Sequence, residues 1–228
     1  MRNLTETESE AIELSTSPDP ETITRPAASD APQRIKRCVQ ACFLLLALPR
    51  LGAYFLGKTL IGERAITSSA ESIARVPGLR GVYLRQAFYG RILDSCGSDV
   101  YLGWNSVFSM PQAKVGEKAY IGRFCSIGFA DIGEEAMLAD GVTVLSGGRE
   151  HDQTASSSSS LHDQGQTLNR VTIGKGAWIG AGAIIMADVG AHSIVGAGSV
   201  VNRPIPAGVI AVGVPAKPCK SRPGFEQD

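Results

Sequence analysis

From about residue 100 onward, an aliphatic residue recurs every six positions and is usually followed by glycine or another small residue. A period of six is incompatible with an amphipathic helix, whose apolar residues recur every three to four positions. It fits short strands that each turn one side chain inward, joined by tight corners where small residues are needed. These recurring aliphatic residues, which we call anchors, form four triplets: Val115, Ile121, Ile127; Ile132, Leu138, Val144; Ile173, Ile179, Ile185; and Val189, Val195, Val201.

Internal repetition at a short fixed period indicates a solenoid, and three strands close a triangular coil. We expect Leu102 and Phe108 to belong to an earlier coil. Because end coils need caps, we expect the helical segment 63–97 to cover one end and the proline-rich segment 203–218 to close the other. An ordinary β-sandwich is the alternative, but anchors kept in step through four triplets argue against it.

The count of six breaks at LSGGREHDQ, residues 145–153, and resumes at Ile173. We predict a loop over 146–170 that leaves the repetitive scaffold. His151 lies in this loop, between Glu150 and Asp152. HDQ recurs at 162–164 after a serine run typical of an exposed linker, so His162 is the rival histidine. The third histidine, His192, is expected to be structural or exposed.

The first hundred residues differ from the repeats in composition and lack the six-residue period. Residues 1–33, rich in acids, Ser, Thr and Pro, predict a disordered acidic tail. Residues 34–97 predict a basic helical arm, which precedes a β-helix domain over 98–220 and a tail over 221–228. Within 34–62, the uninterrupted apolar core is far shorter than a membrane span and is broken by Pro49 and Arg50. We therefore expect helices at a membrane interface, the alternative being an arm packed on protein.

Five cysteines, an odd number without a CxxC pair, argue against a disulfide framework or a metal site. The N-terminus shows no secretory signal. We expect a cytoplasmic protein, peripheral at the inner membrane surface, with no metal and no nucleic-acid partner.

The motifs IGRFCSIG, VTIGKGAWIGAGAII, IVGAGSVV and AVGVPAKP resemble those of the hexapeptide-repeat acyltransferases, which include serine, maltose, galactoside and xenobiotic acetyltransferases. The resemblance covers about residues 100–220. It implies an all-β solenoid, a left-handed parallel β-helix, with homotrimers and active sites between adjacent prisms. The arm and the sequence CGSDVYLG are similar to members that act on sugars in cell-surface polysaccharide assembly.

In that family a loop histidine at the break is the general base, which the resemblance places on His151. It would deprotonate the acceptor hydroxyl for direct attack on acetyl-CoA, without an acyl-enzyme. Asp152 is the expected partner that orients the imidazole, with Glu150, Asp131 and Glu134 as alternatives. Backbone N–H groups of the glycines at 147 and 148 are candidates for holding the thioester oxygen.

The resemblance also places acetyl-CoA along a groove between prisms. The residues it assigns to this groove are Trp178, Ala181, Ala197, Asn202 and Arg203. Relatives commonly carry a Thr-Lys pair where Asn202 and Arg203 stand, so the charge is kept and the hydroxyl is lost. Arg203, Lys217 and Lys220 are candidates for the phosphates.

The sequence thus predicts an O-acetyltransferase that moves an acetyl group to a sugar hydroxyl in a cell-surface polysaccharide or glycolipid precursor. The runner-up is an acetyltransferase of a small soluble acceptor, of the serine or antibiotic type. A γ-type carbonic anhydrase would need three histidines around zinc, here 151, 162 and 192, and none are closely spaced. A non-catalytic β-helix is the remaining alternative.

Overall fold

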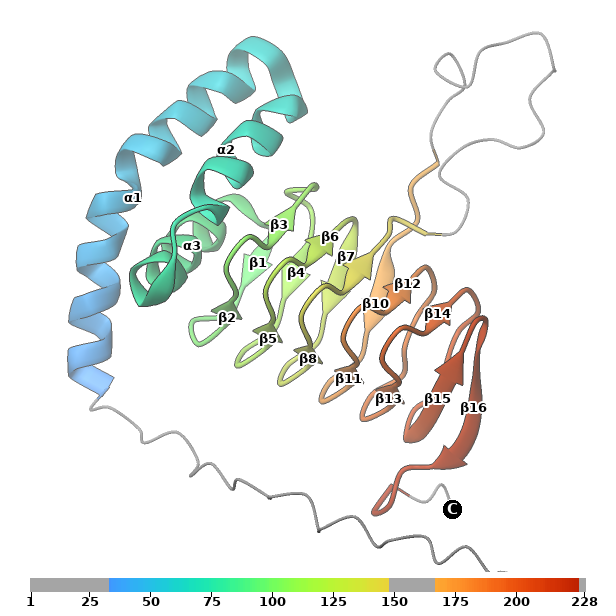
Figure 1. Cartoon of the computed structure of the whole chain (residues 1–228). Helices are drawn as coiled ribbons and strands as arrows, with labels where there is room; N and C mark the ends of the chain where they lie inside the picture. The colour runs from blue at the N-terminus through green and yellow to red at the C-terminus, as the bar shows by residue number, and fades with distance from the viewer. Residues whose placement is uncertain (1–32, 148–166, 226–228) are drawn as a thin grey trace, which may run out of the picture.

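The computed structural model describes residues 33–147 and 167–225 and shows a helical cap on one end of a stack of triangular coils (Figure 1). The helices come first in the chain and the strands follow. The helical elements are α1 (Gln33–Ile61), the 3-10 turn η1 (Gly62–Arg64), α2 (Ala65–Ala74) and α3 (Gly78–Ile92).

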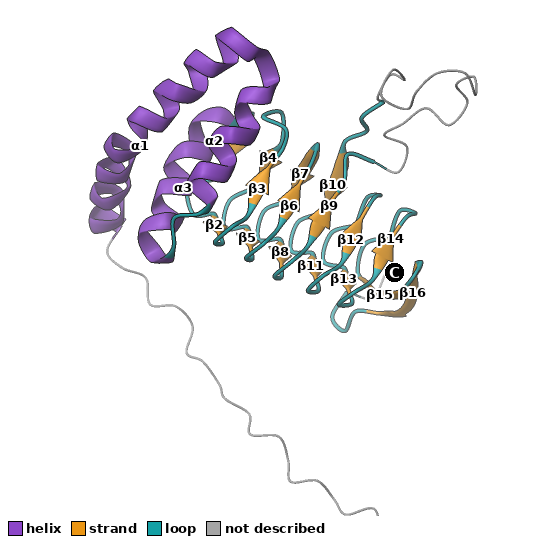
Figure 2. Cartoon of the chain, turned by 45° about the horizontal axis from the view of Figure 1, so that its top comes forward, coloured by secondary structure: helices purple, strands orange, loops and turns teal. Residues whose placement is uncertain are grey.

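The strands form three sheets that make the three faces of a prism (Figure 2). Sheet 1 contains β1 (Ser95–Cys96), β4 (Lys114–Val115), β7 (Ala130–Ile132) and β10 (Val171–Ile173). Sheet 2 contains β2 (Tyr101–Leu102), β5 (Tyr120–Ile121), β8 (Met137–Leu138), β11 (Trp178–Ile179), β13 (Ile194–Val195), β15 (Val209–Gly213) and β16 (Ala216–Ser221). Sheet 3 contains β3 (Val107–Phe108), β6 (Ser126–Ile127), β9 (Thr143–Val144), β12 (Ile184–Ile185) and β14 (Val200–Val201).

Every anchor of the six-residue repeat points into the prism and is buried. Each triplet fills one coil; for example, Val115, Ile121 and Ile127 lie on β4, β5 and β6. Leu102 and Phe108 form the earlier coil, as predicted. Successive coils pair in parallel, which makes the chain a parallel β-solenoid, and its structural neighbours are left-handed β-helices, the expected fold class. Its first strand begins at Ser95, three residues before the expected domain boundary.

Small corner residues let the coils stack at backbone distance. A Cβ placed on Gly103 would lie 2.2 Å from the carbonyl oxygen of Gly122 in the next coil. A Cβ on Gly180 would lie 2.4 Å from the backbone nitrogen of Ala197. The glycine after an anchor is therefore required by the stacking itself.

The cap is tied to the first coil by a buried arginine. Arg85 of α3 is completely buried; its Nε donates to the carbonyl of Leu102 at 3.0 Å. Its Nη1 donates to the carbonyls at the end of α2, the shortest bond being 2.8 Å to Val76. Burial lowers the pKa of the Arg85 guanidinium, and its acceptors within 33–147 and 167–225 are backbone carbonyls, whose dipoles stabilise the charge. This side chain was not singled out by the sequence pattern.

The far end closes differently from the expectation for 203–218. β15 still extends sheet 2 in parallel with β13, and only then does β16 return antiparallel. Prolines do not prevent this last strand because Pro218 lies in the edge strand β16, where a ladder donor is not needed. His192 stacks on Phe225, with ring centroids 4.5 Å apart, and is structural, as expected.

The N-terminal arm requires a correction. Pro49 and Arg50 are expected from the sequence to interrupt the helix, but α1 continues through both and is 29 residues long. Within it, the 24 residues Cys38–Ile61 are long and apolar enough, by length and composition, to cross a membrane. The expectation of an apolar segment far too short to span was wrong, because a helix supported by neighbouring helices tolerates a proline in its interior.

Candidate active site

The predicted loop leaves the prism at the edge between sheet 3 and sheet 1, which we call the loop edge. Its two ends meet in a hydrogen-bonded neck: Asn169 N–H donates to the carbonyl of Ser146 at 2.8 Å. The Ser146 hydroxyl accepts from Phe129 N–H at 3.1 Å. Gly147 begins the departure with a φ of 96°, a conformation that glycine adopts without strain. The scaffold therefore resumes its stacking immediately below the excursion.

The proposed base and its expected partners lie outside the described residues. His151, Asp152, Glu150 and the rival His162 all fall within 148–166. Their assignments stay predictions. Of the expected oxyanion donors, Gly147 is described and stands at the neck, whereas Gly148 is not described.

A cleft of about 610 Å³ opens at the neck. Its lining includes Gly147, Asn169, Arg170, Asp188 and Asn202. These residues come from three successive coils. The residues that flank the loop therefore lie next to residues of the following two coils at this cleft. Asn202 is one of the residues that the family resemblance assigns to acetyl-CoA.

Polar side chains at this cleft are held by the scaffold. Arg170 forms an ion pair with Asp131 and lies 4.2 Å over the ring of Phe129. The Asp188 carboxylate accepts from Thr172 N–H at 2.7 Å. Sequence reasoning missed Arg170 and Asp188. Their signal was positional, since Arg170 precedes the resumption of the count and Asp188 stands where the count shortens between Ile185 and Val189.

Asp131 and Glu134, the two alternative acids that lie outside the loop, are at different edges of sheet 1. Asp131 lies on β7, next to the neck, through its ion pair with Arg170. Glu134 lies at the opposite edge of sheet 1 and pairs with Lys175 at 2.9 Å. The hydrogen bond from Lys175 lowers the pKa of Glu134. Asp131 is thus the one of the two that shares the neighbourhood of the cleft.

The five residues assigned to acetyl-CoA are all exposed, and four of them divide between two edges of the prism. Ala181 and Ala197 stack at the edge between sheets 2 and 3, where Gly198 N–H donates to the Ala181 carbonyl at 2.8 Å. We call this the alanine edge. Asn202 and Arg203 follow β14 at the loop edge.

The whole width of sheet 3 separates these edges. About six residues per face, at about 3.3 Å each, make roughly 20 Å of extended chain. Trp178 lies on the outer face of sheet 2, before the alanine edge. Lys217 is in register with Val212, whose side chain lies over Gly196 beside that edge. One chain therefore cannot present both sets of residues to the same part of a ligand.

The outer face of sheet 2 carries an apolar ladder. Tyr101 and Tyr120 stack with centroids 4.6 Å apart. Met137 and Trp178 follow in register, and each side chain is 49% exposed. A continuous apolar column along a sheet face is typical of a surface that contacts another chain.

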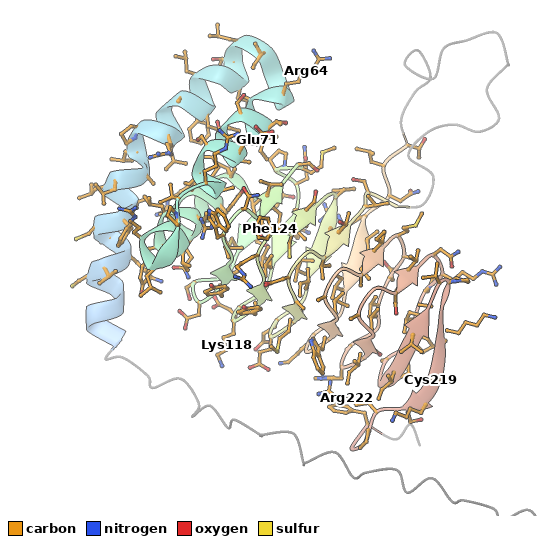
Figure 3. The ribbon with its side chains drawn as sticks, viewed as in Figure 1. Arg64, Glu71, Lys118, Phe124, Cys219 and Arg222 are labelled. Atoms are coloured by element: carbon orange, nitrogen blue, oxygen red, sulfur yellow. The ribbon has the colours of Figure 1, made fainter. Side chains whose placement is uncertain are left out.

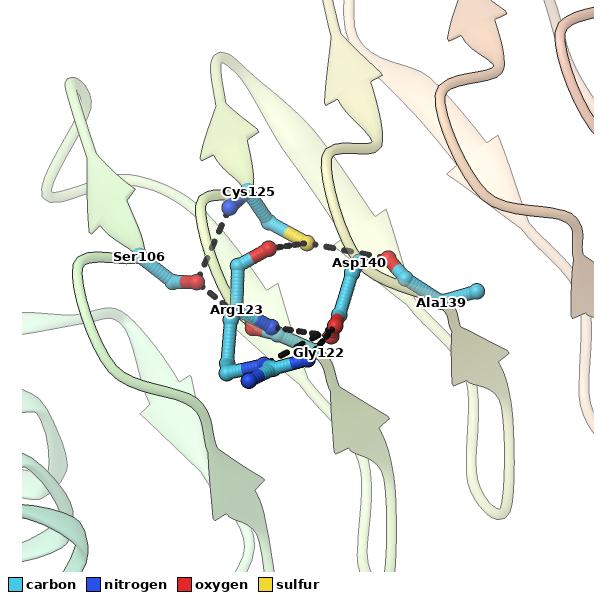
Figure 4. A network of polar contacts seen from close by, with 6 residues as sticks. All are labelled: Ser106, Gly122, Arg123, Cys125, Ala139 and Asp140. Carbon is cyan, nitrogen blue, oxygen red and sulfur yellow. Dashed lines mark hydrogen bonds and ion pairs between the residues drawn. The ribbon is translucent and has the colours of Figure 1, made fainter. Parts of the chain in front are cut away.

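Cys125 belongs to the scaffold and not to the chemistry. It is buried, and its thiol donates to the Ala139 carbonyl at 3.2 Å (Figure 4). Burial raises the pKa of the Cys125 thiol, which disfavours a nucleophilic thiolate. Beside it, Arg123 and Asp140 form an exposed ion pair at 2.6 Å, which the figure also shows.

The fold and the break together define a hexapeptide-repeat β-helix with a loop-edge cleft. No protein-family model matches the chain. The chain is similar to galactoside O-acetyltransferase of Escherichia coli, 34% identical over 90 residues, which are 38% of this chain and 41% of the relative. It is also similar to serine acetyltransferase of Salmonella typhimurium, 34% identical over 126 residues, 52% of this chain and 41% of the relative. A third relative is the bifunctional protein GlmU of Rubrobacter xylanophilus, 31% identical over 50% of this chain and 21% of that protein.

Solved structures agree on the architecture. A maltose O-acetyltransferase from Clostridium difficile 630 superposes with a TM-score of 0.63 at 23% identity, covering 72% of this chain and 89% of that one. A galactoside acetyltransferase in complex with coenzyme A gives 0.59 at 23% identity, covering 70% and 80%. The chain spans less than half the length of the three relatives above. By repeats and fold, the chain resembles these hexapeptide-repeat acetyltransferases.

Proposed function

We propose that this protein is an acetyl-CoA-dependent O-acetyltransferase that modifies a sugar hydroxyl in a cell-surface polysaccharide or glycolipid precursor, on the cytoplasmic side of a membrane. The observation that carries the proposal is the cleft at the loop edge. There a regular β-helix is interrupted, and the interruption carries a histidine four residues after Gly147. The names of the relatives and the coenzyme A bound in one similar structure support the donor and the reaction class.

His151 is proposed as the general base. Four extended residues span at most about 14 Å, which bounds the distance from Gly147 to His151, whereas the seven residues between His162 and Asn169 allow up to about 25 Å. The acceptor oxygen gives its proton to the imidazole while its bond to the acetyl carbon forms. The carbon–sulfur bond then breaks, and the proton passes to the departing sulfur, which leaves as the free thiol.

The described residues fit a coenzyme A chain. At the alanine edge, Ala181 and Ala197 have no side chain beyond Cβ, so a pantetheine arm can approach the backbone amides. Arg203 and Lys217 are exposed cations suited to phosphates. Acetyl-CoA supplies the activated acetyl group, and the chain supplies orientation and the base.

We propose a homotrimer with sites between copies. The alanine edge and the loop edge face away from each other across sheet 3, so they can meet over the same part of a ligand only when they belong to neighbouring chains. The apolar ladder of sheet 2 is the surface best suited to bury against a second copy.

Mixed assemblies test this arrangement. We expect His151→Ala and Ala197→Trp each to abolish activity, the second by blocking the alanine edge. Co-expressed, the two variants should regain activity, because about a quarter of randomly mixed sites would combine an intact loop with an intact alanine edge. The measurement is coenzyme A release by purified mixed assemblies carrying two different affinity tags. No recovery in mixed assemblies would show that each chain contains a complete site.

The overall function is tested by incubating the full chain with acetyl-CoA and separate acceptors. We expect free thiol to be released with oligosaccharides or glycolipid precursors and much less with serine or chloramphenicol. Release only with a small soluble acceptor would overturn the sugar assignment and favour the runner-up. Absence of acetyl-CoA binding in calorimetry would favour the non-catalytic β-helix, and bound zinc with carbon dioxide hydration would favour the carbonic anhydrase.

A further inference from the structure

The outward side of α1 is apolar where a soluble helix would be polar. Its most exposed side chains include Leu45, Leu56 and Leu60, at 67%, 63% and 75% exposure. The other large apolar side chains on α1 that are more than half exposed are Leu46, Leu48, Phe55 and Ile61. A contiguous exposed apolar surface of this kind marks an interaction site.

The charges among the described side chains of α1 lie on the opposite side. From Cys38 to Ile61 the charged residues are Arg50 and Lys58. Helical spacing places both on the side of Ala47, Leu51 and Tyr54, which are buried against the rest of the cap. The usual arrangement, with an apolar side toward protein and charges toward water, is therefore reversed.

The polar group of the outward side is hidden as well. The Thr59 hydroxyl donates to the Leu56 carbonyl one turn earlier, at 2.7 Å, which leaves little polarity at the surface. Such back-bonding satisfies a hydroxyl that faces a medium without water. Over Cys38–Ile61, the outward side thus carries little polarity.

The surroundings of α1 decide between lying on a membrane and crossing it. Phe43 stacks on Tyr83 of α3 at 5.2 Å, and α1 rests along α2 and α3 (Figure 1). These helices carry exposed charges, among them Arg80 and Glu71, which a spanning α1 would draw into hydrocarbon. Only the outward half of α1 can enter the apolar layer without burying them.

We propose that the outward side of α1 is a membrane-docking surface that lies flat in an anionic bilayer interface. Apart from the buried Arg85, residues 34–91 contain nine basic and two acidic residues, a net positive charge that complements anionic headgroups. Because α2 and α3 lie between most of α1 and the first coil, the prism then projects away from the bilayer (Figure 2). The proposal stands whether or not the protein transfers acetyl groups.

Vesicle flotation with the full chain tests the docking surface. The wild type is expected to float with vesicles of phosphatidylglycerol and phosphatidylcholine, and Leu56→Glu is expected to lower the bound fraction at least tenfold. Val214→Glu is the matched control: Val214 is 73% exposed in the turn between β15 and β16, and the charge change is identical. Equal flotation of the two variants, or none by the wild type, would overturn the proposal.

Fluorescent labelling separates docking from self-association. Cys42 is exposed on α1, and Cys219 is exposed on β16, at the other end of the molecule (Figure 3). A polarity-sensitive dye on Cys42, with Cys38 and Cys219 changed to serine, should shift to the blue on adding vesicles; the dye on Cys219 alone should not. A lipid-independent blue shift at Cys42 that disappears on dilution, together with a smaller mass for Leu56→Glu, would mean that a second copy covers α1 instead.

Discussion

Replacing His151 with alanine should lower kcat/KM for acetyl transfer about a thousandfold while leaving the affinity for acetyl-CoA nearly unchanged. A positioned general base contributes about 10² to 10⁴ in rate. The proposed donor-binding residues lie on the coils and not in the loop, so donor binding should survive the change. Steady-state kinetics and calorimetric titration of acetyl-CoA measure the two quantities separately.

His162→Ala is the matched control, because it also replaces a histidine of the predicted loop by alanine, eleven residues further along the chain. We expect it to retain activity near that of the wild type. The wild-type rate should also fall as the pH drops below about 6.5, where an ordinary histidine takes up a proton and ceases to act as a base. Loss of activity in His162→Ala with retention in His151→Ala would exchange the two roles.

Replacing Arg85 with alanine should destabilise the protein by about 3 kcal/mol or more. The change removes the donors to several buried carbonyls and leaves a cavity, and each unsatisfied buried group costs about 1 to 3 kcal/mol. Its Nη2 already lacks a hydrogen-bond partner, so the existing bonds carry the guanidinium. Arg85→Lys should recover only part of the loss, because an ammonium group cannot reach Leu102 and Val76 in the same fork geometry.

Urea denaturation at a fixed protein concentration measures this effect. Arg80→Ala is the control, since Arg80 is an exposed arginine on the same helix, and its loss should change stability by less than about 0.5 kcal/mol. Equal midpoints for the two variants would show that Arg85 does not hold the cap on the prism.

The prism was predictable because each coil repeats one local rule. An inward aliphatic residue followed by a small corner residue is enough to define each strand and turn. The position of Ile121 in the repeat therefore predicts that it is buried, and that of Gly122 predicts a corner. Handedness was not available from the period. It came from the resemblance, since left-handed crossovers run against the usual preference.

The cap was less predictable. Pro49 looked like the end of a helix, but packing along α2 and α3 carries α1 through it. Arg85 looked like one more surface cation of a basic segment, because a sequence gives no sign that carbonyl groups from a helix end and a distant strand will converge on it. These features depend on contacts between segments that do not repeat.

For the candidate site, the sequence by itself determined where the repeat breaks and which histidine follows the break, since both are local departures from a regular count. Only the tertiary structure decided how the partner residues are shared out. It brought Asn202, Asp188 and Arg170 to the loop-edge cleft and placed Ala181 and Ala197 on another edge. The reason is geometric: residues a few positions apart fall on different faces of a triangular coil, whereas residues a whole coil apart become neighbours.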